Sequence, residues 1–229
     1  MASKDFVILR KHTLVKYKGK DTHIVIPDGV KKIKEQAFWD CKGLVSVVIP
    51  DSVTEIGQYA FRGCENLRSV TLSNQLASIP PAMFWGCEKL VSVIIPNSVK
   101  EIGMFAFTYC ENLRSIVLPN SIHSIGDLAF VGCKNLDAIT IPLQVTKLSG
   151  GVLLGCRSLR TLVLQDGVTE IDWEAFAECE NLTHVFIPAS VTKIGKDAFA
   201  HCDKLVIHAP HGSYAETYAM EHNIKFSAE

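Results

Sequence analysis

Eight cysteines recur at a constant interval, and this spacing constrains the fold more than any other feature of the sequence. Each lies 23 residues after the last, without insertion or deletion. The positions are Cys41, Cys64, Cys87, Cys110, Cys133, Cys156, Cys179 and Cys202. A fixed period of this length is typical of arrays in which each repeat is one structural unit stacked on the next. The chain is therefore predicted to fold as a stack of similar coils.

Other residue types recur at fixed distances from each cysteine. Three residues before it stands phenylalanine, replaced once by Leu153, and three residues after it stands leucine. Six and eight residues after it stand Val, Ile or Leu, an alternation that predicts a strand. Proline often ends this run, because it lacks an N–H group and has a fixed φ. The spacing just before each cysteine predicts one helical or 3₁₀ turn.

A single repeat is too small to fold alone. It offers about six large apolar side chains, worth about 2 kcal/mol each when buried. Ordering its backbone costs about 1 kcal/mol or more per residue. Each repeat therefore needs neighbours that cover its two open faces. Seven full strands, with a partial strand at each end, are expected to form a parallel sheet roughly 40 Å long.

The repeat unit resembles a known family. It reads Ala-Phe-x-x-Cys-x-x-Leu-x-x-Val-x-Ile-Pro-x-x-Val-x-x-Ile-Gly, nearly complete from Ala106 to Gly126, and recurs over about residues 22 to 210. This unit is similar to the BspA-like class of leucine-rich repeats. The resemblance implies an α/β right-handed solenoid with a parallel β-sheet on the concave face and short helical or 3₁₀ turns elsewhere. It also implies mostly bacterial or protist surface relatives associated with adhesion and protein binding, and no catalytic residues.

The two ends depart from the repeat and are predicted to be caps, which a solenoid needs for solubility. Residues 1–22 are expected to form a capping hairpin from strands at 6–9 and 13–17, with 18–21 as a turn. Residues 23–210 are expected to form the solenoid, ending in a shortened strand at 205–207. Residues 211–229 are expected to form a cap in which Ser213 opens a helix to about His222, followed by a strand at 224–226.

Composition argues against several partner classes. The formal net charge is -1, which supplies no field for nucleic acid or an anionic membrane. No apolar run approaches the roughly 20 residues needed to cross a bilayer, so no membrane insertion is expected. No signal peptide is recognised at the start, which predicts a cytoplasmic protein if the sequence is taken as it stands. A cell-surface or secreted protein is expected instead if the chain was trimmed from a longer one.

The sequence contains no motif that predicts catalysis, a cofactor or a metal site. The cysteines lack the Cys-x-x-Cys spacing of metal knuckles, and are expected to be small buried hydrophobic residues without disulfides. His208 and His211 have a spacing that a metal could use, but no further ligands accompany them. Gly150, Gly151 and Gly155 are not followed by the Lys and Ser or Thr of a phosphate loop. The chain is therefore predicted not to be an enzyme.

The outward side of the strands offers a candidate docking strip. If residues six and eight after cysteine point inward, those at five and seven face solvent. Position seven is mostly β-branched, and arginine recurs at position four in every second repeat. The predicted partner-binding residues are Arg68, Ile94, Arg114, Val117, Arg160, Val163, His184 and Phe186. Favourable stacking of β-branched residues on neighbouring strands would by itself also maintain the apolar column.

Two functions of different classes follow. The first is a non-enzymatic binding module that recognises another macromolecule through the concave sheet, in protein–protein interaction or adhesion. The alternative is a structural or self-associating scaffold without a specific external ligand.

Overall fold

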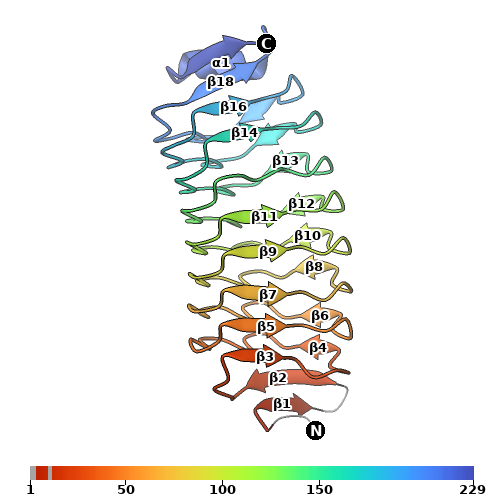
Figure 1. Cartoon of the computed structure of the whole chain (residues 1–229). Helices are drawn as coiled ribbons and strands as arrows, with labels where there is room; N and C mark the ends of the chain where they lie inside the picture. Colours follow the sequence, from red (N-terminus) through yellow and green to blue (C-terminus); the bar gives the residue numbers. More distant parts are fainter. Residues whose placement is uncertain (1–3, 10–11) are drawn as a thin grey trace.

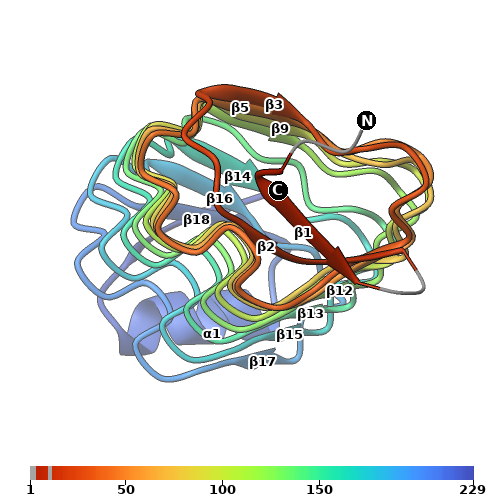
Figure 2. The same ribbon diagram turned by 90° about the horizontal axis from the view of Figure 1, so that it is seen from below.

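The fold is a parallel-sheet solenoid of stacked coils, as the 23-residue period predicts (Figure 1). The computed structural model describes residues 4–9 and 12–229. Seen along the axis, successive coils superimpose closely in outline (Figure 2). The predicted leucine-rich-repeat fold is confirmed.

One column of strands, here the front strands, lies about five to seven residues after most of the cysteines, and β3 holds the same repeat position before the first cysteine. Paired residues are 23 positions apart in most of these strands, for example Ser46 with Ser69 and Val47 with Val70. At the C-terminal end the separation is 22, as between His184 of β16 and Val206 of β18. The period therefore sets the register directly. The front strands are β3 (His23–Val25), β5 (Ser46–Val48), β7 (Ser69–Thr71), β9 (Ser92–Ile94), β11 (Ser115–Val117), β14 (Thr161–Val163), β16 (His184–Phe186) and β18 (Val206–Ala209).

A second column of two-residue strands, here the side strands, was not predicted. Each has an outward first residue and a buried second residue, as in β10, where Glu101 is exposed and Ile102 is buried. These strands place the Ile or Leu at the end of the Val-x-x-Ile segment of each repeat in the core. They are β4 (Lys32–Ile33), β6 (Glu55–Ile56), β8 (Ser78–Ile79), β10 (Glu101–Ile102), β12 (Ser124–Ile125), β13 (Lys147–Leu148), β15 (Glu170–Ile171) and β17 (Lys193–Ile194).

The predicted parallel sheet is not uninterrupted along the solenoid. The front strands form three ladders, β3-β5-β7, β9-β11 and β14-β16-β18-β19. Between the second and third ladders, residues 138–140 form no strand, and one isolated bridge joins Ala138 to Ser115. The side strands are also divided twice, between β6 and β8 and between β12 and β13. Both columns therefore break near β7 and β8 and again around residues 138–140.

The segment before each cysteine consists of tight turns and not the expected helical or 3₁₀ turn. Every second backbone N–H group of this segment forms a hydrogen bond between coils. Those of Gln36, Phe38 and Asp40, for example, donate to carbonyl groups of the next coil. An α-helix or a 3₁₀-helix would direct these N–H groups along its own axis. Backbone hydrogen bonds between coils therefore prevent this segment from forming a helix.

The core is a stack of phenylalanine rings beside a stack of thiols. The rings of Phe38, Phe61, Phe84, Phe107 and Phe130 follow one another with centroids 4.7–5.8 Å apart. The stack stops at Leu153 and resumes where Phe176 meets Phe199 at 5.2 Å.

The N-terminal end is covered by β1 (Phe6–Leu9) and β2 (Thr13–Tyr17), which pair antiparallel and cross the first coil (Figure 2). The Tyr17 ring continues the phenylalanine stack, 5.4 Å from Phe38. Residues 18–21 were expected to be the hairpin turn, but they connect β2 to β3. The two strands of the hairpin are joined through residues 10–12, and residues 10 and 11 lie outside the described part of the chain.

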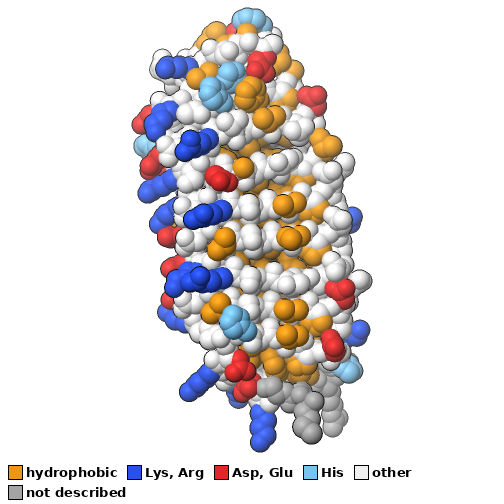
Figure 3. All heavy atoms as spheres, viewed as in Figure 1, with side chains coloured by type: hydrophobic (Ala, Val, Ile, Leu, Met, Phe, Trp, Pro, Cys, Tyr) orange, Lys and Arg blue, Asp and Glu red, His pale blue; other side chains and the backbone are white. Residues whose placement is uncertain are grey.

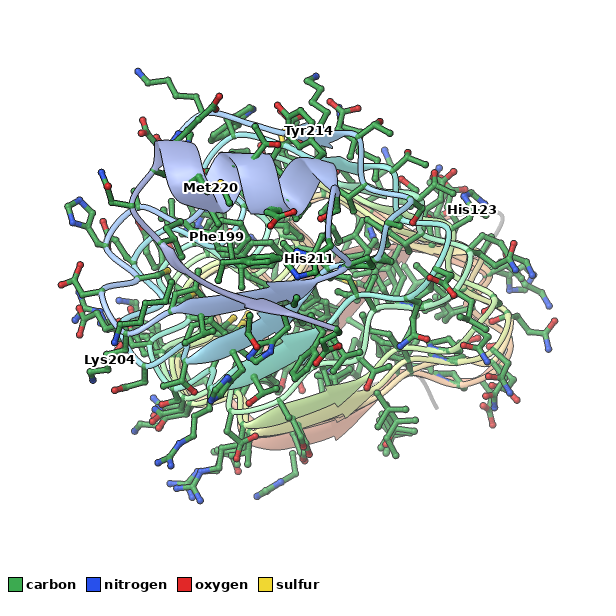
Figure 4. The ribbon with its side chains drawn as sticks, turned by 90° about the horizontal axis from the view of Figure 1, so that it is seen from above. His123, Phe199, Lys204, His211, Tyr214 and Met220 are labelled. Carbon is green, nitrogen blue, oxygen red and sulfur yellow. The ribbon has the colours of Figure 1, made fainter. Side chains whose placement is uncertain are left out.

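The C-terminal end is covered by α1 (Tyr214–Glu221), which lies across the last coil (Figure 4). Ser213 caps the helix by accepting a hydrogen bond from the N–H of Glu216. The strand expected to be shortened is in fact the four-residue β18, because it pairs on both sides, with β16 and with β19 (Lys225–Ala228). Whether residues 1–22 and 211–229 act as separate caps stays a prediction.

Candidate partner-binding face

The outward side chains of the front strands form the surface that the sequence predicted, here called the strand face. In β9, β11 and β14 the middle residue is buried and its two neighbours are exposed. Ile94, Val117 and Val163 keep 77%, 66% and 50% of their surface in contact with solvent. Figure 3 shows hydrophobic side chains along this face. An apolar column of this length is unusual on a surface that meets only water.

The three predicted arginines are exposed along one margin of the strand face. Lys and Arg side chains gather along this margin in Figure 3. Within the described residues, no carboxylate lies at ion-pair distance from Arg68, Arg114 or Arg160. Their positive charge is therefore available to a partner.

Three residues closer to each cysteine, a neighbouring column of charges is largely neutralised within the protein. Lys42 pairs with Glu65 at 2.6 Å, and Lys134 pairs with Glu111 at the same distance. The hydrogen bond from Lys42 to Glu65 raises the pKa of Lys42. These ion pairs join successive coils, so their charges help to hold the coils together. The described residues provide no such partner for the arginine column.

Two shallow grooves flank Arg114. The first, of about 360 Å³, lies between Arg68 and Arg114 and is also lined by Lys89, Val91 and Asn112. Three of its five lining residues are cations and none is acidic. Val91, 42% exposed, supplies its apolar lining.

The second groove, of about 570 Å³, lies between Arg114 and Arg160. Asp137 lines it together with Asn135, Ser158 and Asn181. The carboxylate of Asp137 reduces the positive potential here, so the first groove has the more positive lining.

At the C-terminal end of the strand face, the predicted residues His184 and Phe186 meet His208. The His184 Nδ1 and His208 Nε2 atoms are 2.8 Å apart, at hydrogen-bond distance. The Phe186 ring stacks on the imidazole of His208 with centroids 4.4 Å apart. His208 lies on β18 opposite Phe186. His184 and Phe186 are therefore held together by a third ring, that of His208, which the sequence singled out only for its spacing from His211.

All eight cysteines are free, and seven of them are buried while Cys41 is half-buried. Seven thiols donate to a carbonyl oxygen of the preceding coil, as Cys133 Sγ does to Phe107 at 3.2 Å. Burial raises the pKa of each thiol, in the case of Cys202 to about 11. The cysteines are thus more than small hydrophobic residues, because each buried thiol also satisfies a backbone oxygen.

A separate aromatic cluster on the turn side is satisfied by its own contacts. The guanidinium of Arg62 lies 4.9 Å from the ring of Trp39 and 4.3 Å from that of Trp85. Trp85 in turn stacks on Phe105 with centroids 5.3 Å apart. The guanidinium of Arg62 and the rings of Trp39 and Trp85 therefore already contact one another within the protein.

Neither a metal cluster nor a membrane-spanning helix is found where the structure can be described. Over residues 4–9 and 12–229, no three His, Cys, Asp or Glu side chains gather closely enough to hold a metal ion. In the same residues, no helix combines the length and hydrophobicity needed to cross a bilayer.

The repeats match the BspA type leucine rich repeat region, in six copies over residues 14–103 and 77–206. The chain belongs to this family. Members of this family are repeat scaffolds, and the strand face described above is the outer surface of such a repeat.

Several solved bacterial proteins share the BspA-type fold. A leucine-rich repeat protein of T. pallidum is 26% identical, with 99% of this chain and 97% of that one aligned at a TM-score of 0.65. A leucine-rich cell surface protein of Faecalibacterium prausnitzii is 35% identical, with 89% and 52% aligned at 0.61. A leucine-rich repeat protein of Bacteroides ovatus is 26% identical, with 82% and 68% aligned at 0.63. No curated protein matches the chain.

Four residues of the strand face were missed by the sequence interpretation: Val25, Lys89, Val91 and His208. Val25 is 64% exposed and begins the apolar column before the first cysteine. Val91 occupies the same repeat position as Arg68 and Arg114, so reading that whole column would have found it. Lys89 stands at a different repeat position from the arginines, and no sequence pattern indicates that it lines the same groove.

Proposed function

We propose that this protein is a non-enzymatic binding module that recognises another protein through its strand face. The observation that carries this proposal is the coincidence of an exposed apolar column with a margin of arginines that lack internal partners. Apolar contact supplies affinity and unpaired charge supplies orientation and specificity. A purely structural column would need the apolar stacking but would have no use for unpaired arginines.

A double substitution tests the role of the strand face. Ile94→Lys/Val117→Lys places two charges in the middle of the apolar column, on side chains that are already exposed. Capture of proteins from an extract of the source cells, quantified by mass spectrometry, is expected to lose its specific partners. Met220→Lys is the matched control, because Met220 is as exposed as Val117 but lies on the cap helix (Figure 4). Equal capture by all three proteins would remove the strand face from consideration.

A self-associating scaffold is the alternative, and sedimentation separates the two functions. A binding module is expected to sediment as a monomer at all concentrations. Concentration-dependent association that the Ile94→Lys/Val117→Lys protein lacks would instead assign the strand face to contacts between copies of this chain.

We further propose that the protein acts at the cell surface or in the secreted fraction. The support is the F. prausnitzii relative, which is described as a cell surface protein. Protease treatment of intact cells is expected to remove the protein while leaving a cytoplasmic marker untouched. Full protection of both would reject the surface location.

A further inference from the structure

The groove between Arg68 and Arg114 indicates the kind of segment that binds the strand face. Its lining combines three cations with the exposed Val91, and Ile94 lies on the strand that follows Val91. The ligand must therefore present at least two acidic groups with an apolar group between them. Because no described residue forms an ion pair with Arg68 or Arg114, such a ligand meets guanidinium groups that are exposed to water.

Spacing decides between an extended and a helical ligand. Arg68 and Arg114 are two coils apart, about 9.6 Å at the usual spacing of parallel strands. Along an extended peptide, side chains on one face recur at about 6.8 Å and about 13.5 Å, and neither value fits. Along an α-helix, residues i and i+7 lie on one face about 10.5 Å apart, and residues i+3 and i+4 lie between them.

We propose that the strand face binds an amphipathic acidic helix that runs along the solenoid axis. Acidic residues at positions i and i+7 of this helix pair with Arg68 and Arg114, and apolar residues at i+3 and i+4 contact Val91 and Ile94. This inference rests on the proposed function and specifies the partner for the same surface. Lys89, whose ammonium donates to Asn66 at 2.6 Å, adds positive charge to the middle of the groove.

A designed peptide supplies the test. The probe is a fluorescent peptide of about 20 residues, long enough to be helical, with Glu at i and i+7 and Leu at i+3 and i+4. Its control has the same composition, with the two Glu residues moved to the opposite face of the helix. Fluorescence anisotropy at low salt is expected to show binding of the first peptide, weakened by added salt, and little binding of the control.

Matched charge reversals locate the site on the protein. Arg114→Glu removes a pairing group and introduces repulsion, and is expected to weaken peptide binding about fivefold or more. Lys100→Glu makes the same change in net charge at an exposed position before β10, and is expected to leave binding unchanged. Arg114→Lys keeps the charge and is expected to restore most of the affinity.

Three results would overturn the acidic-helix proposal. They are equal binding of the two peptides, equal weakening by Arg114→Glu and Lys100→Glu, and binding of heparin without binding of either peptide. The last would identify the groove as a site for sulfated glycan. If Ile94→Lys/Val117→Lys abolishes capture of cellular partners while the peptide fails to bind, the acidic helix is rejected and the strand face remains a docking surface.

Discussion

At the scale of single residues, each coil contains two positions with left-handed backbone, one and five residues before the cysteine. Glycine occupies the first of these in four coils, but Asp40, Tyr109, Glu178 and His201 occupy it in the others, with φ of 55–60°. A side chain in this conformation costs about 1 kcal/mol, because its Cβ crowds the backbone. The array therefore carries local strain that its stacking contacts outweigh.

Glu178→Gly is expected to stabilise the protein. Glu178 is exposed and has a φ of 59°, so glycine relieves the strain without removing a buried contact. The expected increase in the free energy of unfolding is about 0.5 to 1 kcal/mol, measured by urea denaturation. Glu178→Ala keeps the Cβ and is expected to give no comparable gain. A loss of stability in Glu178→Gly would contradict this account.

The buried thiols predict that the protein loses stability in alkali. Folding raises the pKa of each thiol, so the folded state keeps its protons above pH 8.5 while the unfolded state loses them. The stabilising contribution is complete below the unfolded-state pKa of about 8.5 and falls as the pH rises above it. Each fully buried thiol then lowers the free energy of unfolding by about 1.4 kcal/mol per pH unit.

Urea denaturation under reducing conditions between about pH 8 and about pH 10 checks this slope. Cys110→Ala/Cys133→Ala removes two of the titrating groups and is expected to show a shallower decline than the wild-type protein. An identical slope in the two proteins would show that the thiols do not control it.

At the scale of elements, the turns and side strands depend on close approach between coils. The glycine that follows four of the eight side strands packs against the backbone of the coil before it. A Cβ built on Gly126 would lie 2.5 Å from the backbone nitrogen of Met104. The sequence shows this glycine as a recurring residue, and the structure supplies its physical reason.

Gly126→Ala is expected to separate two coils and to destabilise the protein by about 1 to 3 kcal/mol, because backbone cannot yield as a flexible side chain does. Urea denaturation measures the change. Gly43→Ala is the matched control, since a Cβ on Gly43 meets nothing within 4 Å. Equal stability of the two variants would reject the close-approach explanation.

At the scale of the whole molecule, one coil departs from the array more than the others. Its front strand is missing at residues 138–140, its side strands lie on either side of a sheet break, and Leu153 interrupts the phenylalanine stack. In a repeat array, stability is the sum of each repeat and its contacts with its neighbours. The coil that lacks a front strand is therefore expected to be a local weak point of the solenoid.

Hydrogen exchange measured by mass spectrometry is expected to locate this weakness. Amides of residues 138–140 should exchange at least about tenfold faster than those of Ser115–Val117, because ladder bonds protect the latter. The two segments lie in adjacent coils at equivalent repeat positions, so each is the other's control. Equal exchange rates in the two segments would show that the break in the sheet does not lower local stability.

The sequence by itself determined the stacked coils, the register of the front strands and the division of their side chains between core and solvent. A constant period leaves no freedom in these features, because residues 23 apart must superimpose. The exposure of Ile94 and Val117 follows directly from that alternation. Their role in binding stays a prediction.

Tertiary structure decided which coil each donor bonds to and which charges find a partner. The side strands, the thiol-to-carbonyl bonds and the break at residues 138–140 all arise from contacts between coils. The groove between Arg68 and Arg114 arises in the same way, because residues from three coils line it. A column of residue types shows what recurs along the array. Only packing in three dimensions sets the distances between charged side chains, and so decides that Lys42 pairs with Glu65 while no described carboxylate pairs with the arginines.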